Sequence, residues 1–243
     1  MIPDLPDAPP VDESEHDPTK PVAFPRWLQR LAQALIILTT PFVLILGSVR
    51  LVMTEQYMRL EYQRPGFPED VFGFTTEDRL EYGPYGIRYI VSNKDISYLG
   101  DLMIDGQPAF HADELQHMED VQVVTLAAFQ ILLILASGLA AGSILLARQK
   151  PTRHLLPKSL RYGGLLTLGL VAVAFLLVLI NWDFFFTGFH EVFFADGTWQ
   201  FSRADTLIRL YPEQFWFDAA VSIGVLTLLG VGFCVALPRF WKP

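Results

Sequence analysis

Four long stretches without a charged residue constrain this chain more than any other feature of its sequence. Charged residues make up 18% of the 243-residue chain, yet none lies within 31–49, 121–147, 162–182 or 219–238. Each stretch comes close to or exceeds the ~20 apolar residues that a helix needs to cross the hydrocarbon core of a bilayer. The sequence therefore predicts an all-α integral membrane protein with four transmembrane helices. It argues against a soluble enzyme, a secreted disulfide scaffold and a nucleic-acid binder.

Lysine and arginine gather on one side of these stretches, and this asymmetry predicts the orientation of the chain. On the other side, Asp and Glu outnumber Lys and Arg by 14 to 5 in residues 55–120 and by 6 to 2 in residues 183–218. We therefore expect both termini in the cytoplasm. The basic residues that predict this orientation are Lys20, Arg26, Arg30, Arg148, Lys150, Arg153, Lys158, Arg161, Arg239 and Lys242.

The predicted layout has nine segments. The four spans are placed at 26–54, at 113–148 (where a helix outside the membrane continues into the second span), at 162–183 and at 216–238. The cytoplasmic segments are a disordered, acidic, Pro-rich tail at 1–25, a basic loop at 149–161 and a short tail at 239–243. The extracytoplasmic segments are a small cap of short helices and possible hairpins at 55–112 and a loop at 184–215.

Local signals in the first outer segment predict where its elements begin. Thr75 or Thr76, followed by Glu77 and Asp78, is typical of a helix start. The Asp105-Gly106 pair favours a type I′ turn and hence a hairpin. Asp113 with Gln116 three residues later approximates a capping box for the helix that enters the second span.

The second outer segment carries similar signals. Asp196-Gly197 predicts a second hairpin between FHEVFF and TWQF. Ser202-x-x-Asp205 resembles a capping box before a short helix, TLIRLY. Pro212 is expected to open the last helix.

Two histidines are expected at the same depth on the outer side of the membrane. His117 lies about one helical turn before the second span, and Glu114 and Asp120 share its helix face. His190 directly follows an aromatic cluster that is typical of a membrane interface. The pair is a candidate for acid–base catalysis, although a histidine is also an ordinary amphipathic interface residue. No metal-ligand spacing, nucleophile elbow or cofactor fingerprint is present, so neither a metal nor a cofactor is expected.

Two stretches of the chain resemble a known family. One is E-x-x-H-M-x-D-V, which enters the second span at Glu114. The other runs from Phe189 through FHEVFF, Trp199, Asp205 and PEQF before the fourth span. Together with the four spans, they are similar to the bacterial lipoprotein intramolecular transacylase (Lit) family and related uncharacterised four-span membrane proteins. The 55–110 insert and the acidic tail depart from the characterised transacylases.

The resemblance implies a multi-pass enzyme of the bacterial cytoplasmic (inner) membrane with its active face outside. Such enzymes move the sn-2 acyl chain of a diacylglyceryl lipoprotein onto its N-terminal cysteine amine and give the lyso form. The expected partners are thus diacylglyceryl lipoproteins and membrane lipid, and no nucleic acid. Two alternatives remain: another outer-leaflet lipid hydrolase or acyltransferase, and a non-catalytic assembly or sensor protein.

On this interpretation, His117 and His190 are the catalytic residues, and their roles as base and acid can be exchanged. Glu114, Asp120 and Glu191 are expected to support them by orienting an imidazole. The candidate substrate-binding residues are Arg79, Trp199, Arg203, Asp205 and Arg209. Each arginine can equally belong to an ordinary salt bridge, and Trp199 can instead anchor the bundle.

Overall fold

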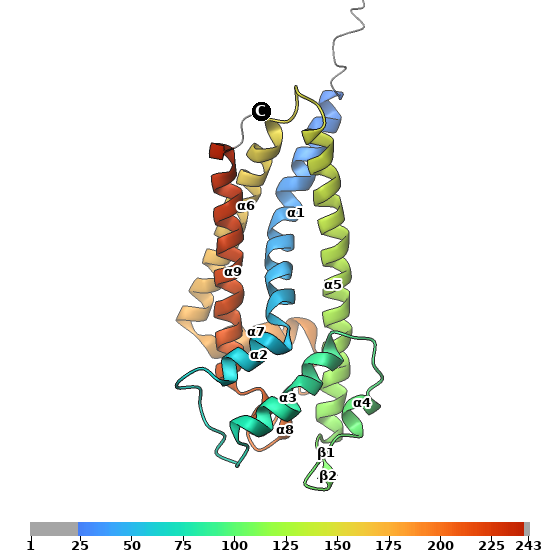
Figure 1. Ribbon diagram of the computed structural model, residues 1–243, viewed down its shortest axis with the longest axis vertical. Coiled ribbons are helices and arrows are strands. Elements are labelled where there is room, and N and C mark those ends of the chain that lie inside the picture. The colour runs from blue at the N-terminus through green and yellow to red at the C-terminus, as the bar shows by residue number, and fades with distance from the viewer. Residues whose placement is uncertain (1–23, 241–243) are drawn as a thin grey trace, which may run out of the picture.

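The computed structural model of the chain describes residues 24–240 and consists mainly of helices. Four of them are long and apolar enough to cross a membrane, and they form the upright bundle in Figure 1. The predicted all-α fold with four spans is therefore confirmed. These helices are α1 (Arg26–Val52), α5 (Ala112–Ala147), α6 (Leu155–Ile180) and α9 (Glu213–Phe240).

Helix α1 lies inside the bundle and packs against α5, α6 and α9 (Figure 1). Small residues on the partner helices allow this close approach. A Cβ atom at Gly163 would lie 2.6 Å from Cβ of Thr40, and one at Gly142 would lie 3.3 Å from Cγ1 of Ile36. Gly142 and Gly138 thus form the face of α5 that contacts α1.

The shorter elements gather at one end of the bundle (Figure 1). Two predictions for the first outer segment are confirmed, the start of a helix and the turn of a hairpin. Thr75 caps α3, where its Oγ1 accepts a 3.1 Å hydrogen bond from the Asp78 N–H. Asp105 and Gly106 have positive φ values of 52° and 75° and close an antiparallel hairpin. The elements are α2 (Glu55–Tyr62), α3 (Thr76–Ile90), α4 (Ser97–Gly100), β1 (Met103–Ile104), β2 (Gln107–Pro108), α7 (Trp182–Phe193) and α8 (Thr206–Leu210).

A buried core joins the cap, which we define as residues 53–111, to α8 and to the start of α9. Met58, Leu99 and Leu210 are fully buried in it. The Tyr62 hydroxyl donates to the carbonyl of Leu210, and the Tyr211 hydroxyl donates to the carbonyl of Gly83. The second outer segment is therefore fastened to the cap at its C-terminal end.

The prediction of a second hairpin is wrong. Residues 182–193 form α7, and within residues 24–240 no strand pairs across Asp196-Gly197. The helix begins because the Asn181 side chain accepts a 3.0 Å hydrogen bond from the Phe184 N–H. Gly197 still turns the chain, with φ of 81°.

Two other helix starts differ from the predicted positions, those of α5 and α6. Helix α5 begins at Ala112, since Glu114 rather than Gln116 accepts a hydrogen bond from the backbone N–H before the helix. Helix α8 begins at Thr206, as predicted, although its N-cap residue is Asp205. Helix α6 already begins at Leu155, within the expected basic loop. The last helix begins directly after Pro212, as predicted. Positions 1–23 of the predicted acidic tail and positions 241–243 of the predicted C-terminal tail lie outside the described residues.

Candidate active site

His117 lies in the polar first turns of α5, before the charge-free stretch that begins at residue 121. Its side chain is only 7% exposed. The ring centroids of Phe194 and Phe201 lie 4.9 Å and 5.4 Å from that of His117. The imidazole is thus enclosed by aromatic rings that come from the second outer segment.

His190 lies on α7, one turn after Phe186. Its Nδ1 is 2.8 Å from the Phe186 carbonyl oxygen, so Nδ1–H donates to that oxygen. The Phe186 ring and the Trp199 ring lie 4.1 Å and 4.8 Å from the imidazole, centroid to centroid. Because Nδ1 carries the proton, the neutral ring presents an unprotonated Nε2, which can accept a proton.

The two histidines face each other. Their ring centroids are 6.3 Å apart and their planes differ by 22°, so the imidazoles are nearly parallel. Phe194 contacts both rings, with centroid distances of 4.9 Å to His117 and 5.6 Å to His190. The fold therefore brings together two titratable groups that lie far apart in the sequence.

The surroundings favour the neutral form of both histidines. Burial lowers the pKa of His117 to about 4; nearby His190 adds to this effect and Asp120 opposes it. Burial also lowers the pKa of His190, against the hydrogen bond to the Phe186 carbonyl. Both imidazoles are thus uncharged at neutral pH and able to take a proton.

Two buried polar atoms of this region have no hydrogen-bond partner. Among the buried side-chain nitrogen and oxygen atoms of residues 24–240, only His117 Nδ1 and Trp199 Nε1 lack one. Such atoms are uncommon in folded proteins and often mark functional positions. Trp199 Nε1 is a donor, and both atoms can pair with polar groups of a substrate.

The three expected supporting acids occupy different environments. Glu114 is fully buried, and its carboxylate accepts 2.7 Å hydrogen bonds from the backbone N–H groups of His111 and Leu207. It therefore joins α5 to α8 instead of orienting His117 directly. Asp120 is half-buried one turn after His117 and raises the pKa of that residue, while Glu191 is exposed on α7.

Two of the candidate substrate-binding arginines hold the cap together. Arg79 is 4% exposed and donates to the carbonyls of Arg209 and Pro68 at 2.9 Å and 2.7 Å. Arg209 donates to Asp70 Oδ2 at 3.0 Å, and its guanidinium carbon lies 3.5 Å from the centre of the Phe74 ring. Neither is part of the aromatic enclosure of the histidines.

Of the other three candidate substrate-binding residues, only one contacts a histidine of the site. Asp205 accepts a 2.7 Å hydrogen bond from the Ser202 N–H and occupies the N-cap position of α8. Arg203 is exposed on the same loop. Trp199 alone packs directly on a catalytic candidate, His190.

The sequence interpretation named Trp199 but assigned no role beside the histidines to Phe186, Phe194 or Phe201, which also enclose them. A helical reading of residues 182–193 would have found two of them, because Phe186 and Phe194 lie four residues before and after His190 and so near the same helix face. Phe201 carries no such signal, since it reaches His117 only through the turn of the loop. No group of three His, Cys, Asp or Glu side chains suited to a metal ion occurs in the described part of the chain.

Comparison with known proteins identifies the family. The family model described as lipoprotein intramolecular transacylase Lit matches residues 34–216, which include both histidines. The chain belongs to the Lit family. It is also 29% identical over 203 residues to an uncharacterised protein of Aquifex aeolicus, covering 83% of this chain and 90% of the relative.

Solved Lit structures have the same fold. The membrane-integral lipoprotein intramolecular transacylase Lit from Bacillus cereus aligns with a TM-score of 0.73 and 21% identity, over 88% of this chain and 95% of that one. Two variants of that protein, in which a histidine is replaced by arginine or alanine, align with TM-scores of 0.66 and 0.63. The present chain is thus a multi-pass membrane protein of a transacylase family.

Proposed function

We propose that the chain is an acyltransferase that moves the sn-2 acyl chain of a diacylglyceryl lipoprotein onto the α-amine of its N-terminal cysteine. The reaction takes place on the extracytoplasmic face of the bacterial inner membrane and leaves a lyso-form lipoprotein. Membership of the Lit family supports the reaction class, and the excess of basic residues at the opposite end of the bundle supports the orientation.

The observation that carries this proposal is the facing pair of neutral imidazoles. His117 and His190 lie 6.3 Å apart, centroid to centroid, in an aromatic enclosure at the end of the spans. Histidine is the side chain most often used for proton transfer in catalysis, and positioned proton transfer contributes about 10²–10⁴-fold in rate. The reaction of an amine with an ester requires proton transfer, because protons must leave the amine nitrogen and one must reach the glycerol oxygen.

The proton balance defines what the histidines do. The cysteine ammonium first loses a proton, and the free amine attacks the sn-2 ester carbonyl carbon to form a C–N bond and a tetrahedral oxyanion. The nitrogen loses a second proton when the C–O bond to glycerol breaks, and the departing glycerol oxygen takes up that proton. The net products are an amide, an alcohol and one proton released to water.

The hydrogen bond between His190 Nδ1 and the Phe186 carbonyl favours His190 as the base. With Nδ1–H held by that carbonyl, Nε2 is the atom free to accept a proton from the amine. The proton that Nε2 takes from the nitrogen as the C–O bond breaks is passed to the glycerol oxygen, and His117 stabilises the oxyanion through an N–H group. Trp199 Nε1–H, a buried donor without a partner, is suited to the oxyanion as well.

No enzyme nucleophile is required by this scheme. The donor ester and the acceptor amine belong to one molecule, and holding them together can lower the barrier by about 7–11 kcal/mol. The exposed aromatic side chains of α7, Phe184, Phe189 and Phe193, are suited to contact the acyl chains of lipid and substrate.

The test is mass spectrometry of N-terminal lipopeptides. The chain is expressed in bacteria whose lipoproteins carry only the diacylglyceryl group, and the position of each acyl chain is determined. We expect an N-acyl cysteine with one remaining ester chain. His117→Ala and His190→Ala should each reduce this product at least about 100-fold.

The matched control is His111→Asn. His111 is exposed six residues before His117 and occupies the N-cap position of α5, where asparagine is also favoured. The control should retain full activity at equal membrane levels. Unmodified diacylglyceryl products from well-expressed chain would refute the transacylase, and release of free fatty acid with an unacylated amine would identify a hydrolase instead.

The orientation has its own test. Lys150→Cys and Asp196→Cys are introduced separately into a Cys234→Ala background and treated with a thiol reagent that does not cross membranes. Both positions are exposed and lie at opposite ends of the bundle. Labelling of the cysteine at 196 but not of that at 150 is expected, and the reverse would place both histidines on the cytoplasmic side.

A further inference from the structure

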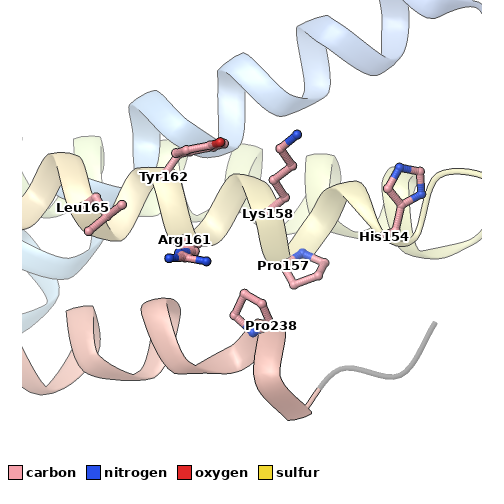
Figure 2. A pocket seen from close by; sticks show the side chains of 7 residues that line it. All are labelled: His154, Pro157, Lys158, Arg161, Tyr162, Leu165 and Pro238. Atoms are coloured by element: carbon pink, nitrogen blue, oxygen red, sulfur yellow. The ribbon is translucent and has the colours of Figure 1, made fainter.

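The end of the bundle opposite the histidines contains a cavity between α6 and α9. It has a volume of about 490 Å³ and is lined by His154, Pro157, Lys158, Arg161, Tyr162, Leu165 and Pro238. Figure 2 shows Arg161 and Pro157 between the two helices, with Pro238 of α9 across from them. We propose that this cavity binds an anionic phospholipid of the adjoining leaflet, with the lipid phosphate at Lys158 and Arg161.

The first argument is the local charge. Lys158 and Arg161 are exposed, and no salt bridge to either is found among residues 24–240. No Asp or Glu occurs in 24–54, 121–182 or 219–240, the segments that build this end of the bundle. The two cations therefore have no carboxylate nearby on these segments, and an external anion has no competitor there.

The second argument is the position of the cations on α6. Helix α6 begins at Leu155, and its first turn contains no acidic residue. The N-terminus of a helix carries a partial positive charge that favours acids, and lysine or arginine placed there is disfavoured. Lys158 and the helix end therefore add to one positive field, which a bound phosphate would neutralise.

The third argument is the apolar part of the cavity lining, which α6 also supplies. Tyr162 and Leu165 are 49% and 43% exposed, and Leu165 lies one turn deeper in the span than Arg161. A cationic mouth above an apolar wall matches a phospholipid, whose phosphate is followed by glycerol and acyl chains. A free phosphate would use the cations alone, so the apolar wall favours the lipid. Basic pockets between helices on the cytoplasmic side are known sites for anionic headgroups.

The test uses the full-length chain, purified in detergent and stripped of lipid. Native mass spectrometry measures its binding of phosphatidylglycerol, of phosphatidylcholine and of inorganic phosphate. We expect phosphatidylglycerol to bind at least tenfold more tightly than phosphatidylcholine, and inorganic phosphate neither to bind nor to compete at equal concentration. Equal binding of the two lipids, or displacement of the lipid by inorganic phosphate at equal concentration, would overturn the proposal.

A pair of double variants locates the site. Lys158→Gln with Arg161→Gln should weaken phosphatidylglycerol binding about tenfold or more, since each cation near an anionic lipid surface contributes about a fivefold effect. Lys150→Gln with Arg153→Gln removes the same charge from the preceding loop, outside the cavity, and should weaken binding less than threefold. Equal weakening by both pairs would show a diffuse surface effect and refute a site.

A third experiment tests whether the acidic N-terminal segment, instead of a lipid, occupies the cavity. A chain that lacks residues 1–20 should bind phosphatidylglycerol as the full-length chain does. Tenfold tighter binding after this deletion would assign the cavity to the acidic segment and overturn the lipid proposal. A Leu165→Asn variant with both cations present should also weaken lipid binding, and unchanged binding would contradict the part of the proposal that concerns the acyl chains.

Discussion

His117 and His190 are held by two different kinds of structure. His117 belongs to a long helix whose start is fixed by the buried carboxylate of Glu114 and by the core of the cap. His190 belongs to α7, a helix in which no residue is fully buried and whose side chains touch the site through aromatic rings. His117 is therefore positioned by a polar network, whereas His190 is positioned by packing against aromatic rings at the expected membrane interface.

This difference indicates how the site can hold one histidine in a fixed position and still admit a substrate. Hydrogen bonds from a buried carboxylate to backbone N–H groups fix position closely, because breaking them leaves buried donors unpaired. A helix with few buried contacts opens at a lower cost in free energy. We therefore expect His117 to stay in place while α7 moves to admit a lipid-linked substrate from the bilayer.

Removing the polar anchor should have the largest effect on stability. Glu114→Ala leaves the N–H groups of His111 and Leu207 without an acceptor, and we expect it to lower the free energy of unfolding by about 3–5 kcal/mol. Glu114→Gln keeps one acceptor oxygen and should cost less. Thermal unfolding in detergent measures both, with Glu119→Ala on the same helix as a control. A Glu114→Ala chain as stable as this control would show that the anchor is unimportant.

On the aromatic side, the polar atom of Trp199 should matter more than its ring. Trp199→Phe keeps an aromatic contact with His190 but removes the buried Nε1–H donor. If that group binds the oxyanion, kcat should fall about 100-fold, equivalent to about 2.7 kcal/mol, with KM little changed. Trp182→Phe on the same segment is the control and should change kcat less than threefold. A loss expressed only in KM would assign Trp199 to substrate binding.

The burial of His117 should appear as a pH dependence of stability. Its pKa is lowered to about 4 in the folded chain, so below pH 6.5 the unfolded chain binds the proton more readily and stability falls as the pH decreases. Between pH 7 and pH 5 this residue should account for about 1 kcal/mol after allowance for solvent screening. His117→Asn lacks this component, so its stability should change less over the same range. Parallel curves for the two chains would contradict an enclosed imidazole.

The smallest effect is expected at Arg203, which is exposed near the site but contacts neither half of the pair in the described residues. Arg203→Gln should alter the transacylation rate less than twofold and leave the unfolding midpoint unchanged. A loss of tenfold or more in the lipopeptide assay would instead assign this arginine to the substrate.

The parts of the fold that could be predicted are those set by local chemistry or by the bilayer. Charge-free stretches predict spans because lipid excludes charge, and Thr75 and the Asp105-Gly106 pair specify a cap and a turn by themselves. The pairing of His117 with His190 was predicted from their common depth alone.

The parts that could not be predicted depend on contacts between distant residues. In the sequence, Arg79 and Arg209 look like substrate-binding residues. Their hydrogen-bond acceptors include backbone carbonyls, which leave no pattern in the sequence. The apolar run FHEVFF is compatible with a strand, and only the Asn181 cap and the neighbouring rings favour a helix there. Glu114 was expected beside an imidazole, whereas it accepts a hydrogen bond from Leu207 of α8, 93 residues away.

The central position of α1 has a consequence for synthesis of the chain. Because α1 comes first, it leaves the ribosome and enters the membrane before any of the helices that surround it. Its Ile36 and Thr40 meet partners on α5 and α6, and its Ser48 receives a hydrogen bond from Thr227 on α9, which is synthesised after the other three spans. The bundle can therefore close only after α9 has been synthesised, and until then the insertion machinery must shield a helix whose polar contacts are still missing.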